Sequence, residues 1–362
     1  GSLADSNLRV IHNEELIHPF QPYNNIATAN QIEYFEKVFN LNSSMSSSNQ
    51  IWQWKELMTL ISMITAMVML IPLSRFLLSL KIFKSLVKEI PDALPKQTRN
   101  SKVVFWLIFF LGASIACLSY IPMVDAAKNI FQAAASREMT WFYPQRMNNS
   151  VMLWASFNGL VGLLLFTLSY QLFGKKHGVS SASWGLNVNM NYIIKTLALS
   201  ILVFSIYYIF LFFIYSIFHV DYRFWFMGVR IFQPEMLLVL AMYAPLFFIF
   251  FFSNSLRVNG AMRIEGQQEW KSMLIAGIAN SLGLFLIIFI QYITFARTGT
   301  VFWTTNWLSV NLLFAIVPMM FILPYFNRYF FYMTGRVYLG PMVTTLVFIM
   351  ILSTNTVVYL PI

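Results

Sequence analysis

Charged side chains are scarce in this sequence, and so are the residue types that build disulfides and metal centres. Asp, Glu, Lys and Arg make up 10% of the 362 residues, whereas about a quarter of a soluble domain is charged. Apolar residues make up 58%, and the mean hydropathy is +0.64. The 36 Phe, 20 Met and 10 Trp are more than one soluble core of this length would bury. These values exclude a soluble enzyme and predict an integral membrane protein.

The sequence has a single cysteine and four histidines. Cys117 lies inside an apolar run and has no partner for an intrachain disulfide. Of the histidines, His177 and His219 lie near opposite ends of two neighbouring apolar runs, which argues against a His-rich metal cluster. We therefore expect neither a metal nor another cofactor.

Long apolar runs dominate the rest of the chain. A membrane-crossing helix needs about 20 mostly apolar residues. Eight runs meet this requirement: 56–80, 103–124, 150–173, 195–219, 235–253, 271–295, 307–326 and 338–360. No internal repeat is evident, so an inverted-repeat transporter design is not predicted. The sequence predicts an all-α polytopic domain of about eight transmembrane helices.

The distribution of Lys and Arg predicts the orientation of these helices, because cytoplasmic connections are enriched in positive charge. One side carries Lys81, Lys84, Lys88, Lys96, Arg99, Lys102, Lys175, Lys176, Lys195, Arg257, Arg263, Lys271, Arg328 and Arg336. The other side carries Lys128, Arg137, Arg146, Arg223, Arg230 and Arg297. This bias also explains the formal net charge of +10 without a nucleic-acid partner. We expect a multi-pass protein of the plasma membrane with both termini outside the cytoplasm.

Ionisable side chains are scarce within the expected spans. This scarcity argues against an ion-coupled transporter, which needs an acidic relay inside the membrane. Asn158 and Asn280 are polar residues within spans three and six, and they are suited to hydrogen bonds between helices.

The first 50 residues differ in character from the rest. Leu8 to Ile11 alternates like a short strand, residues 16–20 form a loop that contains His18, and the pattern from Ala27 to Phe39 is that of an amphipathic helix. A polar, Ser-rich linker follows. About 40 residues are too few to bury a core of their own, and the sequence begins at Gly1 without an initiator methionine. We expect these residues to end a larger domain.

This order of a strand, a loop with a histidine and a closing helix resembles the end of an α/β-hydrolase domain. The resemblance is to bacterial membrane-anchored α/β hydrolases, in which an extracytoplasmic serine hydrolase domain precedes a polytopic region, and it covers residues 1–40 only. In that fold the catalytic triad follows the order Ser, acid, His. The resemblance implies that His18 is the general base, taking a proton from the serine hydroxyl. The chain contains no G-x-S-x-G motif, so the nucleophile and the acid would precede Gly1.

Other residues are weaker candidates for chemistry. His12 is the rival to His18, but it lies at the end of the expected strand and not in the following loop. Asp5 as the triad acid is disfavoured because too few residues separate it from His18. His219 and Asp221 form a pair that would suit a metal or acid–base chemistry, although a cap at the membrane interface is the favoured interpretation.

The sequence thus predicts three parts: the end of an α/β-hydrolase domain (1–40), a linker (41–54) and a membrane domain of about eight helices (55–362). The expected function is a membrane-bound serine hydrolase acting on an ester, amide or peptide bond, with the membrane region as anchor. The fragment alone is expected to be inactive. Its expected partners are the lipid bilayer and the missing N-terminal hydrolase domain. The alternatives are a permease-like transport subunit, as in an ABC exporter, with a short outer arm, and a scaffolding membrane protein without chemistry.

Overall fold

The computed structural model describes residues 3–4, 8–16, 18–175, 179–186, 189–220, 222–224, 227–231 and 233–361. Within these residues, seven helices are long and apolar enough to cross a membrane. They are α2 (Trp52–Ser79), α3 (Arg99–Ile130), α5 (Arg146–Ser169), α6 (Met190–Phe218), α7 (Met236–Leu256), α8 (Glu269–Thr298) and α9 (Trp307–Thr334). Their lengths and composition support the predicted multi-pass membrane protein.

The eighth expected span, 338–360, forms the shorter helix α10 (Leu339–Asn355). Its 17 residues extend about 25 Å, less than the roughly 30 Å of a bilayer core. The chain is extended from Thr356, and the amide of Tyr359 bonds to the carbonyl of Pro144 at 2.9 Å. Most side chains of α10 are buried. Its apolar character therefore reflects its place in the centre of the bundle, against α7, α9 and α6.

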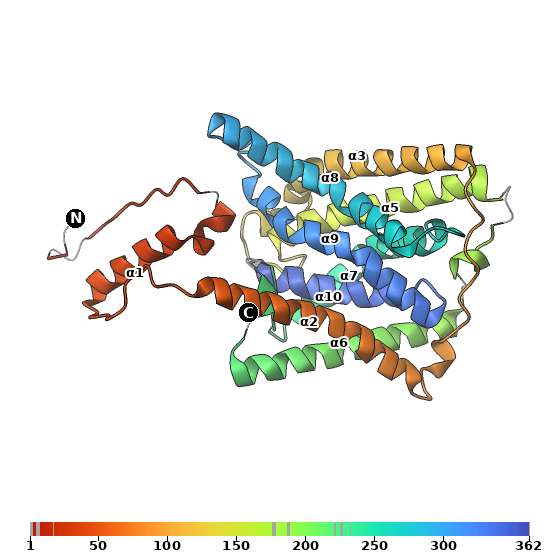
Figure 1. Cartoon of the computed structure of the whole chain (residues 1–362), viewed down its shortest axis with the longest axis horizontal. Helices are drawn as coiled ribbons and strands as arrows, with labels where there is room; N and C mark the ends of the chain where they lie inside the picture. The colour runs from red at the N-terminus through yellow and green to blue at the C-terminus, as the bar shows by residue number, and fades with distance from the viewer. Residues whose placement is uncertain are drawn as a thin grey trace.

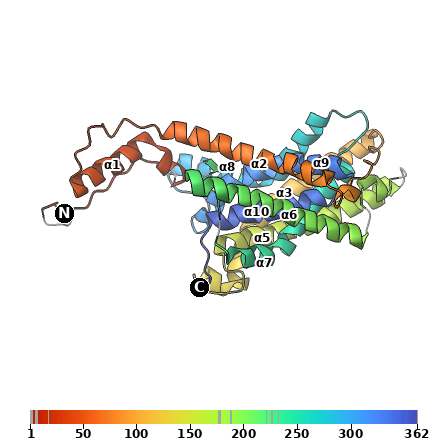
Figure 2. The same ribbon diagram turned by 90° about the horizontal axis from the view of Figure 1, so that it is seen from below.

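The long helices form one bundle with two distinct ends (Figure 1). The N-terminal segment and the C-terminus lie at one end in both views (Figures 1 and 2). The connections after α2, α5, α7 and α9 lie at the opposite end, which the Lys and Arg distribution predicts to be cytoplasmic. Short elements occupy several connections: η2 (Lys84–Leu86), α4 (Gln132–Ala135), η3 (Tyr170–Gly174), η5 (Ala182–Trp184) and η6 (Arg257–Ala261).

The N-terminal segment extends beyond the bundle (Figure 2). It contains η1 (His18–Tyr23) and α1 (Asn25–Phe39), so the amphipathic helix predicted for this segment is present. The Asn24 side chain caps α1 by accepting hydrogen bonds from the amides of Ile26 and Ala27. The side chain of Asn25 accepts a hydrogen bond of 2.8 Å from the indole of Trp52, which ties α1 to the first residue of α2.

The strand expected at Leu8 to Ile11 is not shown. Residues 8–16 belong to no helix or strand, and the Ile11 side chain is 95% exposed. A strand needs a neighbour to complete its hydrogen bonds, and no described residue pairs with this segment. The only described sheet is an antiparallel pair, β1 (Tyr222–Phe224) and β2 (Met227–Val229). It is joined to α2 by an ion pair of 3.0 Å between Arg223 and the buried Glu56.

Candidate functional site

A cavity of about 280 Å³ lies between α3 and α5 at the end of the bundle that is predicted to be cytoplasmic. One face of α3 lines it, from Ser101 to Ala116, and one face of α5 and η3 lines it from Trp154 to Gly174. Residues of α7, η6 and α8 form the back wall, and the connection at 94–98 borders the mouth. Its size is close to the lower end of small-molecule sites, which begin near about 300 Å³.

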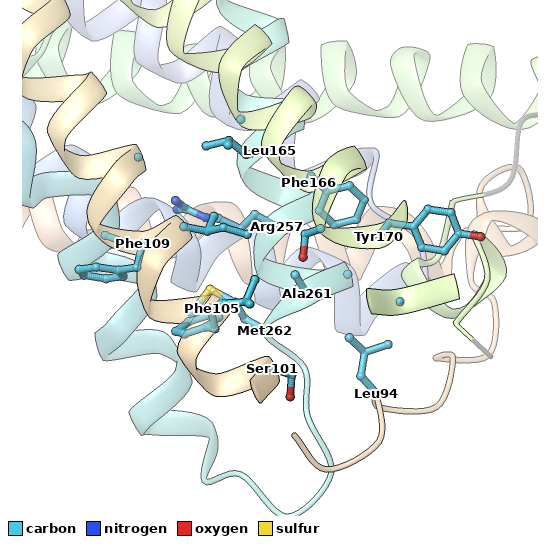
Figure 3. A pocket seen from close by; sticks show the side chains of 18 of the residues that line it. Leu94, Ser101, Phe105, Phe109, Leu165, Phe166, Tyr170, Arg257, Ala261 and Met262 are labelled. Atoms are coloured by element: carbon cyan, nitrogen blue, oxygen red, sulfur yellow. The ribbon is translucent and has the colours of Figure 1, made fainter. Parts of the chain in front are cut away.

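Aromatic and aliphatic side chains make up most of the cavity wall. Figure 3 shows Phe105 and Phe109 of α3 on one side, and Leu165 and Phe166 of α5 on the other. These side chains are partly exposed and not fully buried, because they face the open space between the two helices. The wall is therefore suited to a hydrocarbon chain.

Two π-helical segments border the same cavity. η3 continues α5 over Tyr170–Gly174, and η6 continues α7 over Arg257–Ala261. A π-helical turn widens the helix and changes the direction of the following side chains, and such turns occur frequently at functional sites. Arg257, the first residue of η6, lines the cavity.

Among the described residues that line the cavity, Arg257 is the only Arg and none is acidic. Figure 3 shows its side chain extending from η6 into the space between α3 and α5. One Nη atom donates a hydrogen bond to the side-chain oxygen of Asn280 on α8. Its Nε is buried and has no hydrogen-bond partner in the described structure. The cavity thus contains a guanidinium group without a neighbouring carboxylate.

Asparagine side chains hold Asn280, and with it Arg257, in position. Asn254 of α7 donates to the side-chain oxygen of Asn280 at 2.7 Å, and Asn327 of α9 donates to that of Asn254 at 2.8 Å. The amide of Asn280 donates to the carbonyl of Met320 at 3.2 Å. Bonds to α7 and α9 therefore fix the orientation of the Asn280 side chain on α8. The predicted helix–helix hydrogen bonding of Asn280 is confirmed.

Two further arginines lie near this network, and within the described structure one of them forms an ion pair with a carboxylate. Arg328 of α9, whose side chain is 3% exposed, forms an ion pair of 2.8 Å with Glu269. Arg263 follows η6 and donates to the backbone carbonyls of Pro91, Asp92 and Ser183. Burial, together with the nearby Arg328 charge, lowers the pKa of Arg263. Two buried arginines therefore lie beside the asparagine network.

The contacts of Arg263 fasten the connection that borders the cavity mouth. The amide of Leu94 donates to the carbonyl of Arg263 at 2.7 Å, and the amide of Glu265 donates to the carbonyl of Leu94 at 2.8 Å. Leu94 and Ile264 form an isolated parallel bridge. The segment after η2 is thereby held beside η6, where Lys96 lines the cavity mouth.

Of the predicted hydrolase residues, the structure describes His12 and the backbone of His18, which belong to the N-terminal segment at the end of the bundle opposite the cavity (Figure 1). His18 begins η1, but its side chain and the whole of Asp5 lie outside the described residues. His12 is exposed in a segment without secondary structure. His219 ends α6 as its C-cap, and its proposed companion Asp221 lies outside the described residues. The assignment of His18 as general base stays a prediction.

The Lys and Arg distribution predicted Arg257 to lie in a cytoplasmic connection, whereas the structure places it inside the bundle. The apolar run of span five was expected to end at residue 253, but the helical path continues through η6 to Ala261. The small and amide residues at 253–255 and 259–261 were the available signal, because such residues pack and hydrogen-bond between membrane helices.

Comparisons of the chain with protein families, with curated proteins and with solved structures found no match.

Proposed function

We propose that the membrane domain binds the hydrocarbon chain of an amphiphilic, lipid-like molecule in the cavity between α3 and α5. The shape of the cavity is the observation that carries this proposal. Its lining on α3 extends over Ser101 to Ala116, which corresponds to about 22 Å of helix. One leaflet of a bilayer has a hydrocarbon depth of roughly 15 Å. A single chain inserted from the membrane would be accommodated along its whole length.

Gly112 offers a way to fill this cavity without disturbing the helix. It lines the cavity on α3, and a Cβ built there has no neighbour within 4 Å. We expect Gly112→Phe to occupy the space that the chain would use, while the helix itself is favoured by the loss of glycine. The matched control is Leu111→Phe, which adds a ring at the adjacent residue, whose side chain is 49% exposed and does not line the cavity.

The test is photocrosslinking of the purified chain in vesicles with an amphiphile that carries a diazirine in its hydrocarbon chain. Mass spectrometry should locate the adducts on the cavity faces of α3 and α5. Gly112→Phe should remove these adducts, and Leu111→Phe should retain them. Adducts spread evenly over the outer surfaces of the helices, unaffected by Gly112→Phe, would contradict the proposal.

A second candidate function concerns the N-terminal segment. The helix expected to close an α/β-hydrolase domain is present as α1 and lies outside the bundle (Figure 2). This observation favours the predicted membrane-bound serine hydrolase, with His18 as general base and the membrane domain holding the enzyme at its lipid surface. A permease-like subunit with a short outer arm is the alternative.

Labelling with a fluorophosphonate probe distinguishes these alternatives. The probe should leave residues 1–362 unlabelled. It should label the product of the gene read from an upstream start, on a serine in a G-x-S-x-G motif, and His18→Ala should abolish that labelling. Labelling of a serine within residues 1–362 would refute this assignment, and a start codon close to Gly1 beside an ATPase gene would favour the permease.

A further inference from the structure

We infer that the molecule bound in the cavity is anionic, and that its head group, a phosphate or a carboxylate, binds Arg257. This inference rests on the proposed function and specifies the chemical class of the ligand. The shared chemistry is an oxygen anion attached to a hydrocarbon chain. A membrane phospholipid and a free fatty acid both have it.

The charge balance of the cavity is the first argument. Arg257 lies within the helical span Met236–Ala261, and the described cavity lining contributes no carboxylate to it. The nearby carboxylate of Glu269 bonds through both oxygens to Arg328. A charge inside a membrane domain is costly unless it is paired. A ligand with a negative head group would supply the missing partner.

The hydrogen bonds of Arg257 are the second argument. A guanidinium has five N–H donors, and the only bond that the described structure shows for Arg257 goes to Asn280. This bond fixes the direction of the side chain, because Asn254 and Met320 hold Asn280 in turn. The remaining donors, including the buried Nε, are left for a ligand. Guanidinium binds phosphate and carboxylate oxygens through two parallel bonds.

The arrangement along the cavity is the third argument. Apolar side chains such as Phe109 and Leu165 line the two walls, the Arg257 side chain extends between them (Figure 3), and Lys96 lies at the mouth. A positive group in a largely apolar channel selects a molecule with a long apolar part and one anionic group. An uncharged amphiphile would leave the guanidinium without an anionic partner, and a small anion would leave the channel unfilled.

The experiment is competition against the diazirine amphiphile, with the full chain in neutral detergent micelles at pH 8. Two matched pairs of competitors differ only in the head group: oleate against oleyl alcohol, and dioleoyl phosphatidic acid against dioleoylglycerol. We expect the anionic member of at least one pair to displace the probe at an about tenfold lower concentration than its neutral partner. Hydrogen bonds between charged groups are stronger than those between neutral groups. The ratio of interest is the displacing concentration of the neutral competitor divided by that of the anionic one. The pair with the larger ratio identifies the source as a fatty acid or a phospholipid.

Variants connect this preference to Arg257. Arg257→Gln should bring the ratio close to one, and Arg257→Lys should restore part of it. Asn280→Asp keeps the arginine but gives it a counter-ion, so it should also remove the preference. The matched control is Arg75→Gln, which removes an exposed charge of α2 near the same end of the bundle, and it should retain the wild-type ratio.

Two outcomes separate this inference from the proposed function. If neutral and anionic competitors displace the probe equally well from the wild-type chain, the domain binds an amphiphile but the inference about its charge is overturned. If no competitor displaces the probe and no adduct maps to the cavity, the proposed function itself fails. A preference for anions that persists in both Arg257→Gln and Asn280→Asp would overturn the role of Arg257.

Discussion

Replacing Gly159 by alanine tests how closely α5 approaches α7 behind the cavity. A Cβ at residue 159 would lie 2.7 Å from both the Cα and the N of Phe250, and 2.8 Å from the carbonyl carbon of Ile249. Ordinary contact begins near 3.4 Å. Since these are backbone atoms and cannot rotate away, the helices must separate by about 0.7 Å, and overpacking of this kind costs about 1–3 kcal/mol.

The same change at Gly112 provides the reference. A Cβ at residue 112 has no neighbour within 4 Å, so Gly112→Ala brings only the gain in helix propensity, up to about 1 kcal/mol. Both substitutions add one methyl group to an interior position of a long helix. Their difference in unfolding free energy therefore isolates the contact between α5 and α7, and we expect Gly159→Ala to be the less stable variant by about 1–3 kcal/mol.

The measurement is unfolding in mixed micelles, with sodium dodecyl sulfate titrated into dodecyl maltoside and helicity followed by circular dichroism. Gly159→Ala should unfold at a lower fraction of the denaturing detergent than wild type, and Gly112→Ala at the same or a higher fraction. Equal stability of the two variants would refute the close approach of α5 and α7. It would also remove support for the position of the back wall of the cavity.

Three further substitutions probe the polar contacts. Glu269→Gln leaves the buried Arg328 without an anionic partner. It should lower stability by roughly 1–3 kcal/mol in the same titration, less than the 3–5 kcal/mol of a fully buried pair because Glu269 is half exposed. Asp125→Asn breaks an exposed ion pair and should change stability by about 1 kcal/mol at most; an equal effect of the two would contradict this ranking. Asn24→Ala removes the cap of α1 and should weaken that helix by about 1 kcal/mol, visible as faster amide exchange over residues 25–39; unchanged exchange would show that the cap does not support the helix.

The sequence by itself determined the class of protein and most of its helices. The apolar runs are local features, because a helix that faces lipid must be apolar over about 20 consecutive residues whatever its neighbours are. Seven of the eight expected runs form helices long enough to cross a membrane. The amphipathic pattern of α1 and the role of Asn280 between helices could also be predicted, since each follows from residue type and spacing.

Only the tertiary structure decided the position of Arg257 and the existence of the cavity. The charge of Arg257 is identical to that of any loop arginine in the sequence, and its environment depends on α3, α5 and α8, which are distant along the chain. The pairing of Arg328 with Glu269 depends on the packing of α8 against α9. The short central helix α10 is a similar case, because burial by protein and burial by lipid produce the same apolar sequence. Hydropathy reports whether a residue avoids water, whereas the partner of a buried charge is fixed by which helices pack together.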